Sequence, residues 1–132
     1  GGNSMKKRIL SMIITLALVF GCGAMQAFAA DAKVTASLPA DKKTVSSGYA
    51  AFTATNMFGK VYDISKYPIR YQVMGSNNPS SGTADVATSV TIVPGASSSK
   101  SVNTSYNSYK IVLTGWSVDH AVKGCIGYGY VE

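Results

Sequence analysis

The sequence has few of the side chains that enzymes use for chemistry. Histidine occurs once, as His120, and the only cysteines are Cys22 and Cys125. Charged residues make up just 14% of the chain. No G-x-S-x-G, P-loop, Gly-rich dinucleotide or H-E-x-x-H motif occurs, so hydrolase, nucleotide-binding and zinc-protease interpretations have no motif behind them. We therefore expect a protein that is not an enzyme.

One group of residues could in principle supply a nucleophile, a base and an orienting carboxylate. It consists of Cys125, His120 and Asp119. Adjacent residues of a strand point to opposite faces, so Asp119 could orient His120 only if both lay in a loop. The simpler interpretation is that Asp119 and His120 form an exposed turn between the last two strands.

Metal-binding patterns are equally scarce. One histidine and one cysteine beyond the N-terminal region are too few for a zinc site. Calcium accepts scattered carboxylates, but the aspartates do not have the spacing of a calcium-binding loop. We therefore expect no metal and no cofactor. The aspartates concerned are Asp31, Asp41, Asp63, Asp85 and Asp119.

The one long apolar run lies near the N-terminus and predicts export. Residues 1–4 look like the remnant of an expression tag ahead of Met5. The basic residues 6–8 precede an apolar run over 9–20, and Ala27-Phe28-Ala29 follows, which is the pattern of a cleaved secretory signal peptide. We predict a signal peptide over 5–29, one domain over 30–132, and a secreted protein with no membrane span after cleavage.

Two alternatives would keep the protein at a membrane. Residues 9–30 are long enough to cross a bilayer of about 30 Å if the signal is not cleaved. Cys22 could instead carry a lipid, although Phe20 stands where lipoprotein sites usually have a small residue. Cleavage after Ala29 is the interpretation that we adopt.

The net charge argues against a nucleic-acid partner. The whole chain carries 12 basic and 6 acidic residues, a formal charge of +6. Loss of Lys6, Lys7 and Arg8 with the signal leaves 9 basic residues against 6 acidic ones, or +3. The remaining cations are spread singly, whereas nucleic-acid binding needs them clustered on one face.

Cys125 is the only cysteine left after the predicted cleavage, so the domain cannot form an internal disulfide. Two interpretations stay open for it. The thiol is either buried as a small apolar side chain, or it pairs with another chain.

Alternation of apolar and polar residues with a period of two predicts strands throughout the domain. We expect main strands over 33–38, 48–55, 69–74, 86–93, 106–114 and 124–132, and shorter ones over 60–64 and near Trp116. A turn is expected over 56–60, and loops over 75–83 and 96–103. This pattern predicts an all-β fold, a small antiparallel β-sandwich of about seven strands with immunoglobulin-like or related topology; a small β-barrel is the alternative.

The last predicted strand has one bulky face and one nearly bare face. Tyr128 and Tyr130 alternate with Gly127 and Gly129. Glycine weakens a strand unless a close approach requires it. The bare face therefore marks either a tight packing site or contact with another chain.

Three aromatic residues are the candidate ligand-facing side chains: Trp116, Tyr128 and Tyr130. An exposed aromatic row could stack on sugars or anchor a protein interface, whereas buried rings would fill the core. We expect an extracellular bacterial protein that acts as a non-catalytic binding or interaction module for an unknown protein or glycan. A bacteriocin- or toxin-like effector and a structural subunit of a cell-surface assembly are the alternatives, and the oligomeric state is left open.

Overall fold

The computed structural model describes residues 32–132, so the predicted tag remnant and signal peptide lie outside the described residues. No helix in this part of the chain has the length and apolar character needed to cross a membrane. The described residues form one short 3-10 helix, η1 (Pro79–Ser81), and ten strands. The strands are β1 (Val34–Leu38), β2 (Thr44–Ser46), β3 (Ala50–Ala51), β4 (Asn56–Val61), β5 (Ile69–Ser76), β6 (Asp85–Ile92), β7 (Ser97–Ser101), β8 (Ser108–Ser117), β9 (His120–Ala121) and β10 (Gly127–Val131).

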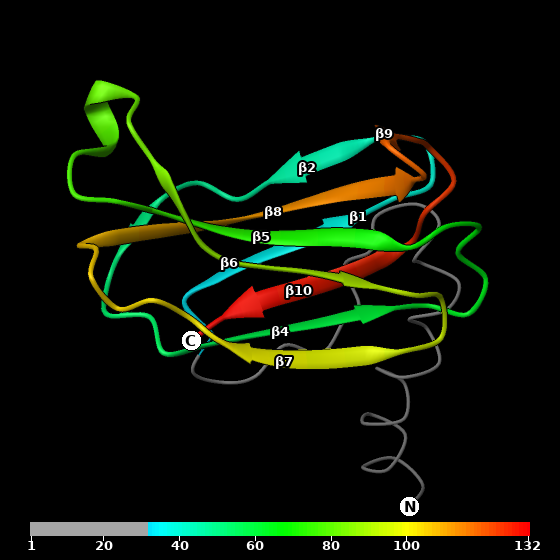
Figure 1. Ribbon diagram of the computed structural model, residues 1–132, viewed down its shortest axis with the longest axis horizontal. Helices are drawn as coiled ribbons and strands as arrows, with labels where there is room; N and C mark the ends of the chain where they lie inside the picture. Colours follow the sequence, from blue (N-terminus) through cyan, green and yellow to red (C-terminus); the bar gives the residue numbers. More distant parts are fainter. Residues whose placement is uncertain (1–31) are drawn as a thin grey trace, which may run out of the picture.

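The strands form two antiparallel sheets (Figure 1). The four-stranded sheet has the order β1-β10-β4-β7, and the six-stranded sheet has the order β2-β8-β5-β6, with the short β3 and β9 also paired to β8. The two sheets do not close into a barrel. The prediction of a small antiparallel β-sandwich is therefore confirmed.

The strand order is that of a jelly roll. The chain passes from one sheet to the other between β1 and β2, β3 and β4, β4 and β5, β6 and β7, β7 and β8, and β9 and β10, while β5 and β6 are neighbours in one sheet. Eight main strands divided between two sheets in this way make the two Greek keys of a jelly roll, which shares the two-sheet sandwich architecture of the immunoglobulin fold but not its strand order.

The core consists of the inward-facing residues of both sheets. Alternate residues of β5 and β8 are fully buried, as the period-two pattern of the strands predicted over 69–74 and 106–114 requires. Burial of this apolar surface is the main stabilising contribution to such a fold. The buried hydrophobic residues of β5 and β8 are Ile69, Tyr71, Val73, Tyr109, Ile111 and Leu113.

The bare face of β10 is a tight packing site within the sandwich. A Cβ atom added at Gly129 would lie 2.8 Å from the Tyr71 ring, and one added at Gly127 would lie 3.0 Å from the Tyr71 hydroxyl. That hydroxyl donates hydrogen bonds to the carbonyls of Lys60 at 2.8 Å and Tyr128 at 3.0 Å. The glycines therefore let β10 approach a buried tyrosine of the opposite sheet.

Two predictions in the middle of the domain are wrong. Residues 56–60, predicted as a turn, belong to strand β4, and residues 48–55, predicted as a strand, contain only the two-residue β3. Gly59 gave the turn signal, but it faces Gly129 in the register and lies against Tyr71. The glycine is thus explained by close packing and not by a turn.

Three boundaries also differ from the prediction. The serine-rich segment 96–103 was expected to be a loop, but it contains edge strand β7, whose side chains are mostly exposed. Strand β4 ends at Val61, so the short strand over 60–64 does not form. Trp116 lies in the final part of β8 and does not begin a new strand.

Candidate functional site

The three predicted aromatic residues do not gather in one place. Tyr128 and Tyr130 lie in β10, on the outer face of the four-stranded sheet, because Gly127 and Gly129, which alternate with them, face inward. Trp116 lies in β8 of the six-stranded sheet, where Gly115 beside it packs inward against Cys125. All three rings are half-buried.

Tyr128 and Tyr130 belong to an aromatic strip, which we define as Phe58, Tyr62, Tyr128 and Tyr130. The ring centroids are 5.3 Å apart for Phe58 and Tyr130, 6.2 Å for Phe58 and Tyr128, and 6.0 Å for Tyr62 and Tyr128. Burial raises the pKa of the Tyr128 phenol, and the neighbouring tyrosines add to the effect. Phe58 was not among the predicted site residues because a turn was predicted over residues 56–60.

Trp116 packs beneath a cation. The guanidinium carbon of Arg70 lies 3.9 Å from the centroid of the Trp116 ring, which is a cation–π contact. The Nε atom of Arg70 is buried and has no hydrogen-bond partner. Trp116 and Arg70 therefore form a packed pair on the six-stranded sheet, apart from the aromatic strip.

The structure does not bring Cys125 and His120 into one site. Cys125 is fully buried, and its thiol donates to the carbonyl of Pro68 at 3.5 Å. His120 and Asp119 are exposed at the turn between β8 and β9. Of the two interpretations left open for Cys125, the structure shows the buried thiol, and the exposed turn predicted for Asp119 and His120 is confirmed. Within residues 32–132 no three His, Cys, Asp or Glu side chains are grouped to hold a metal ion.

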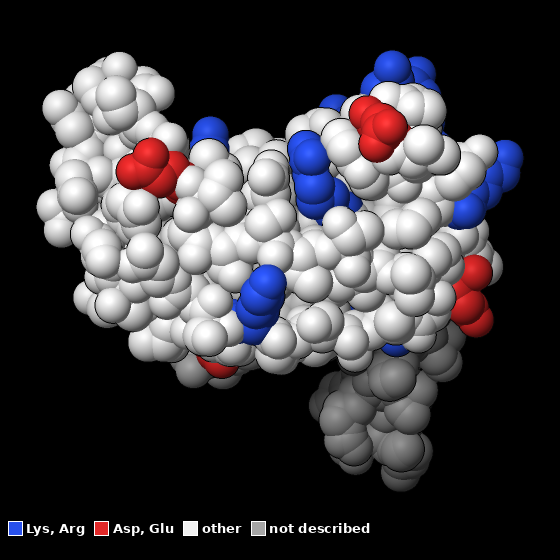
Figure 2. All heavy atoms as spheres, in the orientation of Figure 1, with Lys and Arg blue, Asp and Glu red and all other residues white. Residues whose placement is uncertain are grey.

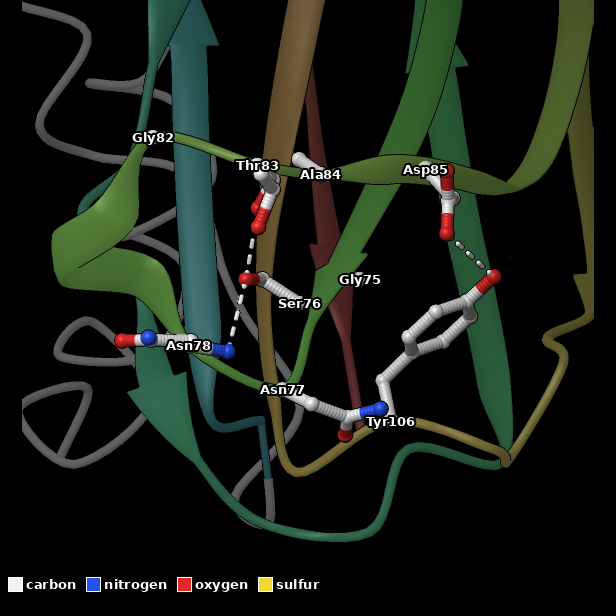
Figure 3. A pocket seen from close by; sticks show the side chains of 9 residues that line it. All are labelled: Gly75, Ser76, Asn77, Asn78, Gly82, Thr83, Ala84, Asp85 and Tyr106. Atoms are coloured by element: carbon white, nitrogen blue, oxygen red, sulfur yellow. Dashed lines mark hydrogen bonds between the residues drawn. The ribbon is translucent and has the colours of Figure 1, made fainter.

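A polar pocket lies where the loop that carries η1 folds over one end of the six-stranded sheet (Figure 3). Its volume is about 500 Å³. In the close view Ser76 and Thr83 lie on one side of the pocket, and Asp85 and Tyr106 lie on the other. The lining residues are Gly75, Ser76, Asn77, Asn78, Gly82, Thr83, Ala84, Asp85 and Tyr106.

Hydrogen bonds within the loop fix the shape of the pocket. The Ser76 hydroxyl donates to the Thr83 carbonyl at 2.6 Å and accepts from the Asn78 backbone N–H at 3.1 Å. Gly82 closes η1 with φ of 82°, a left-handed conformation that suits glycine. The Asn77 side chain accepts from the Asn107 N–H at 2.8 Å, which ties the loop to the segment before β8. These hydrogen bonds hold the loop over the end of the sheet.

Tyr106 and Asp85 form one wall of this pocket. The Tyr106 ring lies against the bare backbone of Gly75, where a Cβ would overlap it, and meets Tyr109 edge-on with centroids 6.0 Å apart. The Tyr106 hydroxyl donates to Asp85 Oδ2 at 3.3 Å. Desolvation raises the pKa of the Tyr106 phenol, and the negative charge of Asp85 raises it further. The wall therefore presents a neutral phenol and a carboxylate.

No local pattern in the sequence marks this pocket. Turn-forming composition predicts a loop over residues 75–83, but Tyr106 lies far away in the sequence. The only available signal was the density of Asn, Ser, Thr and Asp over 76–85, which is also typical of an ordinary surface loop.

Comparison with known proteins gives no family. No protein-family model matches the sequence, and no curated protein matches it significantly. A solved structure titled "Crystal structure of PirA" is similar to this chain with a TM-score of 0.45 at 8% sequence identity. The match covers 80% of this chain and 97% of that chain.

Proposed function

We propose that this chain is a secreted, non-catalytic β-sandwich protein that binds a saccharide in the pocket beneath η1. The proposal rests on a pocket that the hydrogen bonds of its own loop hold in shape, and whose wall pairs the Asp85 carboxylate with the Tyr106 phenol. The N-terminal sequence pattern supports export. The effector and structural-subunit alternatives stay predictions.

The chemistry of the lining suits a hydroxyl-rich ligand. Sugar hydroxyls both donate and accept hydrogen bonds, and the pocket offers a carboxylate, side-chain amides, hydroxyls and a phenol. An apolar ligand would take these groups out of water without replacing their hydrogen bonds. Because Asp85 is the one charged side chain in the lining, an anionic ligand is disfavoured there.

The size and order of the pocket also favour binding of a small ligand. A volume of about 500 Å³ lies within the usual range for small-molecule sites. A loop held by its own hydrogen bonds loses less conformational entropy when a ligand binds than a disordered loop does. The aromatic strip and Trp116 remain candidate contacts for a longer glycan or a protein partner.

Substitution of the pocket wall tests the proposal. Protein collected from the growth medium would be titrated with a panel of neutral mono- and oligosaccharides by calorimetry. We expect Asp85→Asn to weaken binding by about tenfold or more, since a hydrogen bond to a charged group contributes about 1.5–3 kcal/mol. Tyr106→Phe should weaken binding by a smaller factor.

A matched control is Asp63→Asn, which removes an exposed carboxylate from the loop between β4 and β5. Saccharide binding should not change in this variant. Absence of binding to every neutral saccharide tested, or equal affinities for the wild type and the two pocket variants, would contradict the proposed function.

A further inference from the structure

Large apolar side chains are exposed mainly at one end of the sandwich. Five such side chains are exposed among residues 32–132, and four of them follow the outgoing ends of β4, β6 and β8. Only Val86, in β6, lies elsewhere. The exposed fractions of the four are 52% for Ile64, 37% for Tyr67, 56% for Val93 and 81% for Val118.

Contacts between the loops hold this end together. The Gly95 N–H, after β6, donates to the carbonyl of Val61 at the end of β4. The Trp116 N–H in β8 donates to the carbonyl of Pro68, next to Tyr67, at 3.0 Å. These loops lie at the right-hand end in Figure 1, opposite η1. We call this surface the loop end, defined by residues 39–43, 62–68, 93–96, 118–119 and 122–124.

Val118, in the loop end, has both an unfavourable backbone conformation and an exposed apolar side chain. It has φ of 54°, and the pairing of Ser117 with His120 makes Val118 and Asp119 a two-residue turn. A β-branched residue rarely adopts this left-handed conformation, which asparagine and glycine hold more easily. The side chain gains no burial in exchange, because it is 81% exposed. Such strain without a packing benefit is more often found at functional positions.

Lysines lie among the four exposed apolar side chains of the loop end, which we call the apolar tips. Lys42 and Lys43 precede β2, Lys66 lies between Ile64 and Tyr67, and Lys123 precedes β10. Three aspartates lie among them, so the loop end has a net charge of +1 from four lysines and three aspartates. Figure 2 shows basic side chains standing out at this end with acidic ones between them. The aspartates are Asp41, Asp63 and Asp119.

We propose that the loop end docks on the surface of a lipid bilayer that contains anionic lipids. Isolated apolar tips on separate loops can each enter the boundary between headgroups and acyl chains, while lysines contact lipid phosphates. A tyrosine such as Tyr67 is typical of this boundary region. Because the net charge is small, insertion of the apolar side chains is expected to contribute most of the binding free energy. The lysines are expected to add a smaller electrostatic contribution.

A protein partner fits the loop end less well. Protein interfaces have a contiguous, well-packed centre from which lysine is depleted. Here the apolar tips are separated by lysines, which suits a fluid surface better than a rigid one. Docking at this end does not depend on the proposed saccharide site, because η1 and its pocket lie at the opposite end of the strands.

Val118→Asn tests the proposal with a variant that is expected to fold well. Protein collected from the growth medium would be sedimented with vesicles of phosphatidylcholine mixed with phosphatidylglycerol, and with vesicles of phosphatidylcholine alone. The wild type should bind the mixed vesicles more tightly. Val118→Asn should weaken this binding by about tenfold, as expected for loss of one buried valine side chain. Its melting temperature should be equal to that of the wild type or higher, because asparagine tolerates the turn conformation.

Val86→Asn is the matched control, since it removes a valine that is 49% exposed but lies in β6 beside the pocket end. It should bind vesicles as the wild type does. The proposal is overturned if the wild type does not bind the mixed vesicles, if Val118→Asn binds them equally well, or if Val86→Asn reduces binding as much. Saccharide titration of Val118→Asn should be unchanged, which keeps failure of docking distinct from failure of the proposed function.

Discussion

At the scale of single residues, Tyr71 links the two sheets. Its ring comes from β5 of the six-stranded sheet, and its hydroxyl donates to carbonyls of β4 and β10 in the other sheet. A buried hydroxyl with two acceptors avoids the cost of burying an unpaired polar group. The ring fits there because Gly59, Gly127 and Gly129 leave its surroundings bare.

Gly129→Ala is expected to destabilise the protein. The added Cβ would lie 2.8 Å from the Tyr71 ring and 2.9 Å from the Phe58 carbonyl oxygen, so backbone as well as side chain must shift. Overpacking of this kind typically costs about 1–3 kcal/mol in the free energy of unfolding. Urea denaturation would measure the change.

Gly48→Ala provides the control, because an added Cβ there meets no atom within 4 Å. It should leave the stability unchanged or raise it by about 0.4–1 kcal/mol through the unfolded state. Equal stabilities of the two variants would show that the close approach at Gly129 is relaxed in solution.

Tyr71 also predicts a loss of stability at alkaline pH. Burial raises the pKa of its phenol above the ordinary value of 10.0. Above pH 10 the unfolded chain releases this proton while the folded protein retains it, so the free energy of unfolding falls by about 1.4 kcal/mol per pH unit. The contribution of Tyr71 is fully present below pH 10 and declines as the pH rises further.

The variant Tyr71→Phe separates this effect from other ionisations. It should be less stable at neutral pH by about 0.5–1.5 kcal/mol, since the one hydroxyl hydrogen shared between the carbonyls of Lys60 and Tyr128 is lost. Its stability should also fall less steeply above pH 10 when unfolding is followed in urea at several pH values. An unchanged slope would mean that other groups cause the alkaline loss.

At the scale of strands, β8 is the organising element of the six-stranded sheet. It pairs with β2 and β3 on one side, with β5 on the other, and with β9 at its end. By contrast, β7 is an edge strand of serines and one lysine with exposed side chains. Polar side chains and a lysine on an edge strand discourage pairing with another chain.

This difference predicts that backbone amides exchange their hydrogens more slowly in β8 than in β7. Amides of Ile111 and Leu113 in β8 should exchange only through global unfolding, because they lie in a strand with neighbours on both sides and a buried face. Amides of β7 should exchange faster, through local opening of the edge. Exchange followed by NMR checks this order, and similar protection in β7 would indicate that another chain covers it.

At the scale of the whole molecule, the two ends of the sandwich differ in chemistry. The η1 end has a polar pocket with a carboxylate, and the loop end has apolar tips among lysines. The ten residues of β8 separate the two ends by about 30 Å at the usual rise per residue. A protein docked through its loop end would therefore hold the proposed saccharide site away from the bilayer.

The fold class and several of the strands could be predicted from the sequence. Alternation predicted the strands that form β5 and β8, because side chains in a strand point to opposite sides in turn. The bare face of β10 left close packing as one of two interpretations, and the lone Cys125 left a buried thiol as one of two. These inferences succeeded because each depends on residues that are near one another in the chain.

Strand β4, the pocket and the loop end depend on contacts between distant parts of the chain. Strand β4 was not predicted because Gly59 is typical of a turn. In the structure this glycine makes room for the ring of Tyr71, which is distant in the sequence. The pocket needs Tyr106 to lie on Gly75, and the loop end needs five separate connections to meet. Jelly-roll pairing joins residues as distant as Val34 and Val131. Contacts of that kind depend on how the whole chain packs, so no local pattern in the sequence records them.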